Sequence, residues 1–187
     1  RRHSFPTRRS SDLVNIRELV EDKPFKVVAN LPYYITTPII MGILEQKLPV
    51  TRLVTMIQKE VADRMIAKPG KKDYGSLSVA VQYYTEPEIV ALVPPKSFIP
   101  SPAVDSVVIS CKVRPQPAVK VNSEKMFFTI AKGGFAQRRK TLSNSLKTTG
   151  IPADRIKGAL ESAGIDGNRR GETLSLQEFA DIANNLA

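Results

Sequence analysis

The four residues Asn30-Leu31-Pro32-Tyr33 offer the groups that can hold a planar base carrying an exocyclic amine. The Asn30 amide both donates and accepts hydrogen bonds, Leu31 and Pro32 offer carbonyl oxygens, and Tyr33 offers an aromatic face. The apolar run at 25–29 predicts a short buried strand that ends at this turn. Because ligands bind outside the carboxyl ends of strands in open α/β sheets, the turn is a candidate base-binding site. The plainer alternative is a strand-end turn whose tyrosine only packs.

The composition favours a soluble globular protein with a polyanionic partner. The chain has 187 residues, a formal net charge of +10 and a pI of about 9.8, which indicates nucleic acid first and an anionic membrane surface second. No apolar run approaches the ~20 residues that span a bilayer. Cys111 and His3 are the only residues of their types, so the sequence argues against a disulfide framework and a zinc site. We therefore expect a cytoplasmic protein with no metal and no membrane contact.

The first thirteen residues, 1–13, carry four arginines and show no hydrophobic periodicity. One interpretation is a basic arm that binds RNA. We favour another, because the string resembles translated sequencing adapter at the broken end of a gene fragment, and such non-native segments are kept out of fold reasoning. On this interpretation native sequence begins near Val14, His3 is no catalytic candidate, and the arginines exaggerate the net charge.

Residues 14–114 predict alternating strands and helices. Thr36 or Thr37 is expected to cap a helix that Pro49 ends, and Ser76 is expected to cap another. The order strand, helix, strand, helix is typical of a parallel sheet. The long alternating strand near the end is expected to run antiparallel to its neighbour, and the proline-rich loop before it holds Phe98 in place. The expected strands are 25–29, 53–57, 88–93 and 104–113, and the expected helices cover 36–48, a segment ending near 68, and a segment from 76.

The pattern becomes helical after a linker marked by Pro115 and Pro117. A first helix is expected to end at a Gly133-Gly134 break, and further helices are expected near 141–147 and 152–163. Ser175 and Glu178 fit a capping box that begins the last helix. We therefore expect a compact helical unit over 115–187.

Five motifs follow one another along the chain, and together they carry a family resemblance. They are Asn30-Leu31-Pro32-Tyr33, Gln58-Lys59-Glu60-Val61, Tyr74-Gly75-Ser76-Leu77-Ser78, Phe98-Ile99-Pro100-Ser101-Pro102-Ala103-Val104-Asp105-Ser106 and Phe135-Ala136-Gln137-Arg138-Arg139-Lys140-Thr141-Leu142. In this order they resemble the ribosomal RNA adenine N6-dimethyltransferase family, specifically its small-subunit 16S branch. The resemblance implies an α/β fold: the C-terminal part of a Rossmann-like S-adenosylmethionine-dependent methyltransferase sheet at 14–114, followed by a small all-α rRNA-binding domain at 115–187.

The resemblance implies a mechanism that the residues can support. An adenosine is flipped out of the RNA, Tyr33 stacks on one face of the base, and Phe98 closes the other. The Asn30 side-chain oxygen and the carbonyl of Leu31 or Pro32 accept the two N6–H bonds and aim the nitrogen lone pair at the methyl group of S-adenosylmethionine. Asn30 thus also borders the cofactor. Transfer is then an in-line displacement driven by positioning and electrostatics, without a metal or a covalent enzyme intermediate.

The resemblance names 16S rRNA, in a precursor of the small ribosomal subunit, as the partner. Charge runs are usually solvated helix surfaces, and that alternative applies to the basic residues of this chain. Given the family match, we expect phosphate contacts instead. The expected RNA-binding residues are Lys59, Arg64, Arg138, Arg139, Lys140, Lys147, Arg169 and Arg170.

One part of the family pattern is missing. The family binds its cofactor through a Gly-rich loop after the first strand and an acidic residue at the end of the second, and neither precedes Asn30 in this sequence. Asp12 falls in the segment 1–13 and is not assigned that acidic role. We therefore expect a monomeric, incomplete copy of the enzyme that does not bind S-adenosylmethionine measurably by itself.

Two other functions stay open at this point. The large-subunit adenine methyltransferases that confer macrolide resistance form a sister class, but they commonly have Ile where this chain has Leu31. The second alternative is a non-catalytic RNA-binding factor for ribosome assembly or transcription, built on the same fold. The presence of Asn30, Pro32 and Tyr33 argues against lost catalysis.

Overall fold

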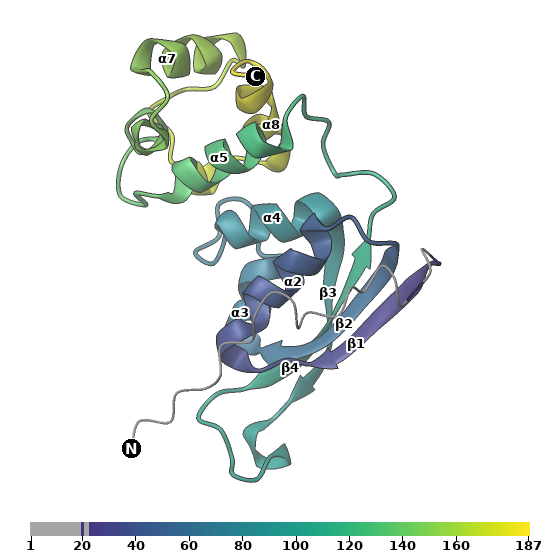
Figure 1. Cartoon of the computed structure of the whole chain (residues 1–187). Coiled ribbons are helices and arrows are strands. Elements are labelled where there is room, and N and C mark those ends of the chain that lie inside the picture. The colour runs from purple at the N-terminus through teal and green to yellow at the C-terminus, as the bar shows by residue number, and fades with distance from the viewer. Residues whose placement is uncertain (1–19, 21–22) are drawn as a thin grey trace, which may run out of the picture.

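A four-stranded sheet with helices against it forms one half of the molecule (Figure 1). The computed structural model describes residue 20 and residues 23–187. The segment 1–13 and most of the segment 14–22 lie outside these described residues. The strands follow the order β1-β2-β4-β3. Their bounds are β1 (Phe25–Asn30), β2 (Val50–Gln58), β3 (Thr85–Val93) and β4 (Ser106–Val113), and the accompanying helices are α2 (Thr36–Glu45), α3 (Lys59–Ile66) and α4 (Ser76–Tyr84).

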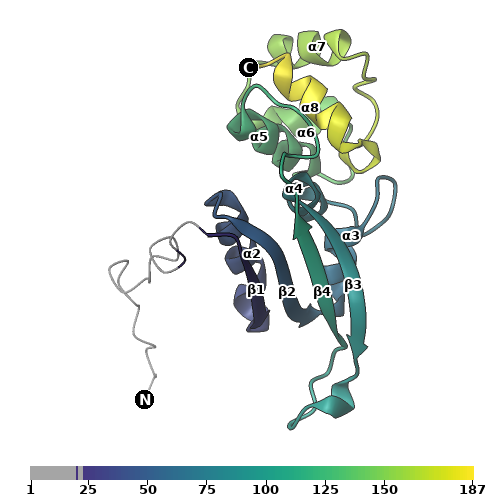
Figure 2. The same cartoon turned by 90° about the vertical axis from the view of Figure 1, so that its right-hand side faces the viewer.

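The strand directions bring four chain segments to one edge of the sheet. β1 and β2 are parallel because α2 crosses over between them, whereas β4 is antiparallel to both β2 and β3. The carboxyl ends of β1, β2 and β3 and the beginning of β4 therefore meet at the same edge, here called the carboxyl edge (Figure 2). The predicted parallel pair and the predicted antiparallel strand are both confirmed, although that strand begins at Ser106 and not at Val104.

Helix α4 joins the sheet to the helical residues that follow it. Leu77 and Val81, four residues apart on one face, are buried in the apolar cluster that covers the sheet. Val79 and Tyr83, on another face, are buried in the apolar cluster of the helical residues. Burying one large apolar side chain stabilises a fold by about 1.5–3 kcal/mol, so α4 contributes to the stability of both clusters.

Residues 115–187, here called the helical part, contain α5 (Glu124–Phe135), α6 (Leu142–Leu146), α7 (Ala153–Ser162) and α8 (Leu176–Asn184). Short 3-10 helices lie at Lys147–Thr149 and Gly171–Thr173, and two more lie in the sheet half at Tyr33–Ile35 and Pro95–Ser97. The predicted capping box is confirmed: Ser175 accepts a hydrogen bond from the Glu178 backbone, and Glu178 accepts one from Ser175. Helix α5 packs on α8.

Three local predictions are wrong. Helix α5 runs through Gly133 and Gly134 to Phe135. Both glycines are buried, and neighbouring side chains leave no room for a Cβ at either position. Ser76 does not cap α4; the cap position is Gly75, whose N–H donates to the Ser78 hydroxyl at 3.0 Å. Helix α2 likewise begins with Thr36, and neither threonine caps it.

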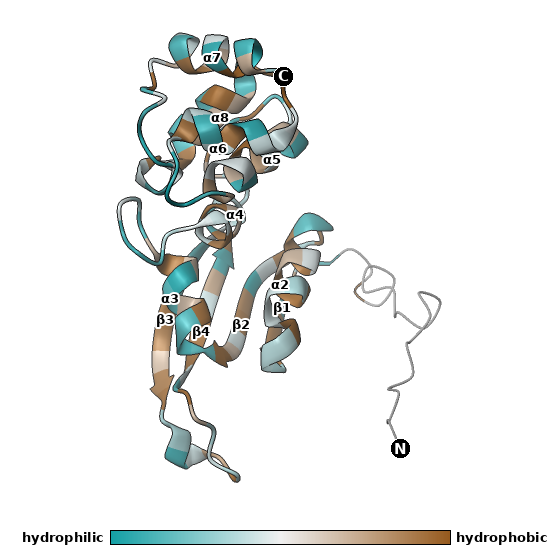
Figure 3. Ribbon diagram, turned by 90° about the vertical axis from the view of Figure 1, so that its left-hand side faces the viewer, coloured by the Kyte–Doolittle hydropathy of each residue, from teal (hydrophilic) through white to brown (hydrophobic). Residues whose placement is uncertain are grey.

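The edge strand β3 is apolar along much of its length (Figure 3). Val90 and Leu92 expose 54% and 60% of their surface, and Ile99 in the following loop is fully exposed. Cys111 on the neighbouring strand β4 is buried, and burial raises the pKa of its thiol to about 11, so it is an unreactive core residue. Within the described residues, no helix is long and apolar enough to cross a membrane.

Candidate base-binding site and RNA-facing residues

Asn30 ends β1 at the carboxyl edge, opposite Met56 of β2. Side chains alternate along the strand, so Lys26, Val28 and Asn30 share its exposed face. Among the described residues, no group pairs with the Asn30 amide. An exposed amide at a strand end, with its oxygen free, is able to accept a hydrogen bond from a ligand amine.

The two carbonyls that follow Asn30 differ in their partners. The Pro32 carbonyl accepts the Ile35 N–H at 3.1 Å and the Thr36 hydroxyl at 3.0 Å, because it starts the turn that leads into α2. The Leu31 carbonyl accepts no hydrogen bond from the described residues. Of the two acceptors that the sequence left open, Leu31 is therefore the one with free lone pairs.

Tyr33 is half-buried and is held by its hydroxyl group. It lies on the short 3-10 helix after Pro32, and its hydroxyl makes a 2.7 Å hydrogen bond with the hydroxyl of Ser106 at the beginning of β4. Ser106 is fully buried, whereas the neighbouring Tyr34 exposes 87% of its surface. The structure thus brings the first and fourth sequence motifs together at the carboxyl edge.

Phe98 lies in the connection between β3 and β4, at the same edge. It follows the 3-10 helix Pro95–Ser97, its backbone N–H donates to the Pro95 carbonyl at 3.1 Å, and its side chain is half-buried. The proline-rich loop therefore places Phe98 at the carboxyl edge. Its role in closing the second face of a base stays a prediction.

The basic residues of helix α3 lie between the carboxyl edge and the helical part. Lys59 begins α3 directly after β2 and forms an ion pair with Asp63 at 2.6 Å, and this hydrogen bond raises the pKa of Lys59. Arg64, near the end of α3, is exposed and lines a hollow of about 610 Å³ together with Lys72 and Arg138. Helix α3 thus connects the carboxyl edge, where the flipped base is expected, with the helical part, where phosphate contacts are expected.

Arg138 links the helical part to the loop after α3. Its guanidinium donates to the Lys72 carbonyl at 2.5 Å and lies 3.6 Å from a Glu172 carboxylate oxygen. The Gly70 N–H also donates to the Glu172 carbonyl, at 2.7 Å. Arg138 therefore holds two segments together in addition to the RNA contact expected of it.

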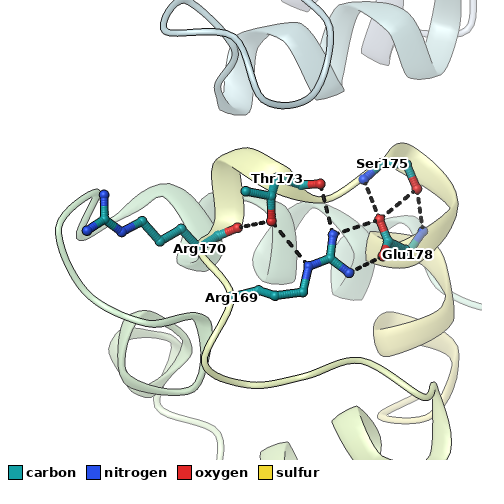
Figure 4. Close-up of polar contacts among 5 residues, drawn as sticks. All are labelled: Arg169, Arg170, Thr173, Ser175 and Glu178. Atoms are coloured by element: carbon teal, nitrogen blue, oxygen red, sulfur yellow. Dashed lines mark hydrogen bonds and ion pairs between the residues drawn. The ribbon is translucent and has the colours of Figure 1, made fainter.

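Arg169 is engaged inside the helical part (Figure 4). Its guanidinium contacts both carboxylate oxygens of Glu178 and also donates to the hydroxyl and the carbonyl of Thr173. Most of the Arg169 donors are therefore used within the fold, and an RNA contact of Arg169 stays a prediction. Arg170 is exposed, and its guanidinium points away from this cluster (Figure 4).

The ion pair of Arg169 with Glu178 predicts a pH-dependent stability. The hydrogen bond from Arg169 lowers the pKa of Glu178, so its stabilising effect is present above the unfolded-state pKa and is lost as the pH falls through the lower folded-state pKa. We expect Glu178→Gln to cost about 1–2 kcal/mol at pH 7, and this difference to begin to shrink near the unfolded-state pKa of about 4.3 and to vanish only below the lower folded-state pKa. Urea unfolding at several pH values measures it.

Glu161→Gln serves as the control, since Glu161 is exposed and its one ion pair among the described residues is with Lys157, at 3.8 Å. Its loss should change stability by less than about 0.5 kcal/mol at every pH. A cost of Glu178→Gln that did not depend on pH would contradict the assigned cause.

Arg139, Lys140 and Lys147 are exposed basic residues of the helical part. Lys140 and Lys147 line a shallow hollow with Gln137, Asn144 and Thr148, and the Lys147 ammonium donates to the Asn144 side chain at 3.0 Å. Arg139 and Lys140 make no side-chain ion pair with the described residues. Their charges are free for an anionic ligand.

Two residues at these sites were not identified from the sequence as site residues. Ser106 stood within a quoted motif, but nothing in its spacing signalled a bond to Tyr33, which is 73 positions away. Lys72 lies in the loop between α3 and α4, and the fold places it beside Arg64 and Arg138. Only the packing of distant segments reveals either role.

The fold has the Rossmann-like arrangement of known methyltransferases. A dimethyladenosine transferase from Plasmodium falciparum superposes with a TM-score of 0.74 over 86% of this chain and 66% of that protein, at 24% identity. The 23S rRNA methyltransferase ErmE superposes with a TM-score of 0.61, over 88% of this chain and 66% of that protein, also at 24% identity. At this identity the likeness establishes the fold class predicted from the sequence.

Sequence comparison identifies the family. Residues 8–187 match the sequence model described as Ribosomal RNA adenine dimethylase, and the chain belongs to that family. The match begins inside the segment 1–13. Among curated relatives, Ribosomal RNA small subunit methyltransferase A of Clostridioides difficile is 56% identical over 91% of this chain, and that of Alkaliphilus metalliredigens is 52% identical over 93%. The chain spans 61% and 63% of the length of these relatives, respectively.

Proposed function

We propose that this chain carries the adenosine-binding side of an enzyme that dimethylates N6 of adenosines in 16S rRNA, using S-adenosylmethionine as the methyl donor. The observation that carries the proposal is the pair of free acceptors at the carboxyl edge, the Asn30 amide oxygen and the Leu31 carbonyl, beside the anchored ring of Tyr33. Membership of the ribosomal RNA adenine dimethylase family supports it.

The two acceptors address the chemical difficulty of the reaction. The lone pair of an adenine N6 is delocalised into the ring, so the amine is a poor nucleophile. Hydrogen bonds from N6–H to Asn30 and to the Leu31 carbonyl favour a more tetrahedral nitrogen whose lone pair leaves the plane of the ring. Stacking on Tyr33, worth about 1–3 kcal/mol, holds the base in that position. Because these groups are positioned before the base arrives, they stabilise the transition state without reorganisation.

The described residues fit the acceptor adenosine more fully than the methyl donor. S-adenosylmethionine supplies the electrophilic methyl group when it is bound. Within the described residues no strand precedes β1, so the Gly-rich loop and the strand-end acidic residue of the family are not among them. We assign Asn30 to both the adenosine and the cofactor. The other groups described above, the Leu31 carbonyl and the Tyr33 ring, bind the adenosine alone.

The helical part supplies the RNA contacts in this proposal. Arg139, Lys140 and Lys147 lie on its exposed surface, Arg170 points outward, and Arg64 with Lys72 continues the positive charge toward α3. Lys59 then lies at the carboxyl edge, directly after β2. Phosphates along this line would leave a flipped base close to Tyr33.

Neutralising Arg139 and Lys140 should weaken RNA binding without changing the fold, because neither makes a side-chain ion pair with the described residues. We expect Arg139→Gln combined with Lys140→Gln to lower affinity for a small-subunit rRNA stem-loop by about tenfold in low salt, and to reduce the slope of log affinity against log salt by about 2. Fluorescence anisotropy at several salt concentrations measures both quantities.

The control removes the same charge elsewhere: Lys125→Gln combined with Lys157→Gln changes exposed lysines of α5 and α7. Its salt slope should stay close to that of the unchanged chain. Equal losses in the two double variants would indicate a general charge effect and would contradict a defined RNA surface.

The branch and setting of the enzyme are part of the proposal. The two relatives named above are both called small-subunit rRNA methyltransferases. Their names favour the 16S enzyme over the large-subunit class and over a non-catalytic RNA-binding factor. We propose a precursor of the small ribosomal subunit as the partner, a monomer as the working form and the cytoplasm as the location.

A chimera tests the function directly. This chain replaces its matched region in the Clostridioides difficile relative, and transfer of labelled methyl groups to small-subunit RNA is measured. Two methyl groups on N6 of each target adenosine are expected. A folded chimera that binds the RNA and transfers no methyl group would overturn the proposal.

A further inference from the structure

We infer that Ser106 is a positioning residue for the base-stacking ring of Tyr33. The inference rests on the proposed function, because it assumes that Tyr33 receives the flipped adenine. Ser106 itself touches no reacting atom in this proposal. Its hydroxyl fixes the ring through the 2.7 Å hydrogen bond to the Tyr33 hydroxyl.

The two ends of this bond differ in how firmly the backbone holds them. Ser106 is fully buried and lies in β4 between two neighbours, opposite Gln58 of β2 and Val93 of β3. The preceding carbonyl, of Asp105, also accepts the Lys59 N–H at 2.9 Å. Ser106 is therefore a fixed point of the sheet.

Tyr33, by contrast, lies on a single 3-10 turn outside the sheet, between Pro32 and helix α2. Short 3-10 segments have poorer hydrogen-bond geometry than α-helices, so the backbone alone holds the ring weakly. A hydroxyl bond at the far end of the ring restrains its direction. Because this bond is made at the ring edge, it leaves an aromatic face available for stacking.

Loss of this hydrogen bond would affect the Ser106 hydroxyl as well as the Tyr33 ring. The Ser106 hydroxyl has no other hydrogen-bond partner among the described residues, so removing the Tyr33 hydroxyl leaves a buried polar group unpaired. The two hydroxyls therefore act as a unit, and changing either one should release the ring to a similar extent.

The test uses the whole chain and a fluorescent base. The probe is a uridine pentanucleotide with a central formycin, an adenosine isomer that keeps the exocyclic amine and loses fluorescence when it stacks on an aromatic ring. Quenching at saturation reports the stacked fraction, and anisotropy of an end-labelled copy reports affinity. We expect Ser106→Ala to lower the ratio of stacked to unstacked base about fivefold, with little change in affinity.

The companion variants separate positioning from a merely structural role. Tyr33→Phe should reduce quenching as much as Ser106→Ala does, and the double variant should reduce it no further than either single variant. Ser106→Thr, which keeps a hydroxyl group, should retain quenching. Ser110→Ala is the matched control: Ser110 is a buried serine of the same strand that accepts a bond from Arg52 at 2.7 Å, and its loss should leave quenching unchanged. If Ser106→Ala fails to fold, Tyr33→Phe alone carries the test.

Two results would overturn the inference, and they are distinguishable. If Tyr33→Ala abolishes quenching while Ser106→Ala and Tyr33→Phe keep it, the base stacks on Tyr33 but Ser106 does not position the ring. If Tyr33→Ala leaves quenching intact, the base does not stack there, and the proposed base-binding site fails together with the inference.

Discussion

Asn30→Ala should lower methyl transfer by about 100-fold or more in the chimera with the Clostridioides difficile relative, which is the effect typical of removing one preorganised polar group from an active site. The change removes the free amide oxygen at the end of β1 and leaves the Leu31 carbonyl as a single acceptor for two N6–H groups. Rates with labelled S-adenosylmethionine and small-subunit RNA measure the loss.

Affinity for RNA should change by less than about twofold in the same variant, because Asn30 adds no charge to the RNA-facing surface. Val28→Ala is the matched control, since Val28 lies two residues earlier on the same exposed face of β1 and exposes 78% of its surface. Its rate should stay close to that of the unchanged chimera. A rate for Asn30→Ala near that of Val28→Ala would show that the amide does not take part in the reaction.

Gly171→Ala should destabilise the helical part by about 3 kcal/mol, the upper range for overpacking a buried site. A Cβ at Gly171 would lie 2.2 Å from the carbonyl oxygen of Gly134 in α5. Because that atom belongs to a helix backbone, no side-chain rotation relieves the clash. Gly171 also follows Arg170 directly, so displacement of this segment should weaken RNA binding. Urea unfolding of the whole chain measures the change as a lower midpoint.

Gly158→Ala is the matched comparison, because the same glycine-to-alanine change should here raise the stability of the chain. Gly158 is an exposed residue inside α7, and a Cβ there meets nothing within 4 Å. The change should stabilise the chain by about 0.5–1 kcal/mol, because alanine loses less backbone entropy in a helix. Similar effects of the two substitutions would contradict the close approach of Gly171 to α5.

Much of the fold follows from local sequence pattern. The apolar run before Asn30, the alternation along 106–113 and the pairing of Ser175 with Glu178 each depend on residues within a few positions of one another. One of the wrong local predictions had a tertiary cause. Gly133 and Gly134 predicted a helix break, but α5 continues through them because the close contacts with Thr149 and Phe179 require glycine there.

The sequence by itself determined the chemical groups of the candidate site: an amide and carbonyls at a strand end, a tyrosine, and a basic helical part. Only the tertiary structure decided which of those groups are free. It showed that the Pro32 carbonyl is occupied while that of Leu31 is open, that Arg169 is bound by Glu178, and that Ser106 holds Tyr33. The physical reason is that local pattern specifies elements and their faces, whereas the availability of a donor or acceptor depends on distant segments that the sheet order brings together.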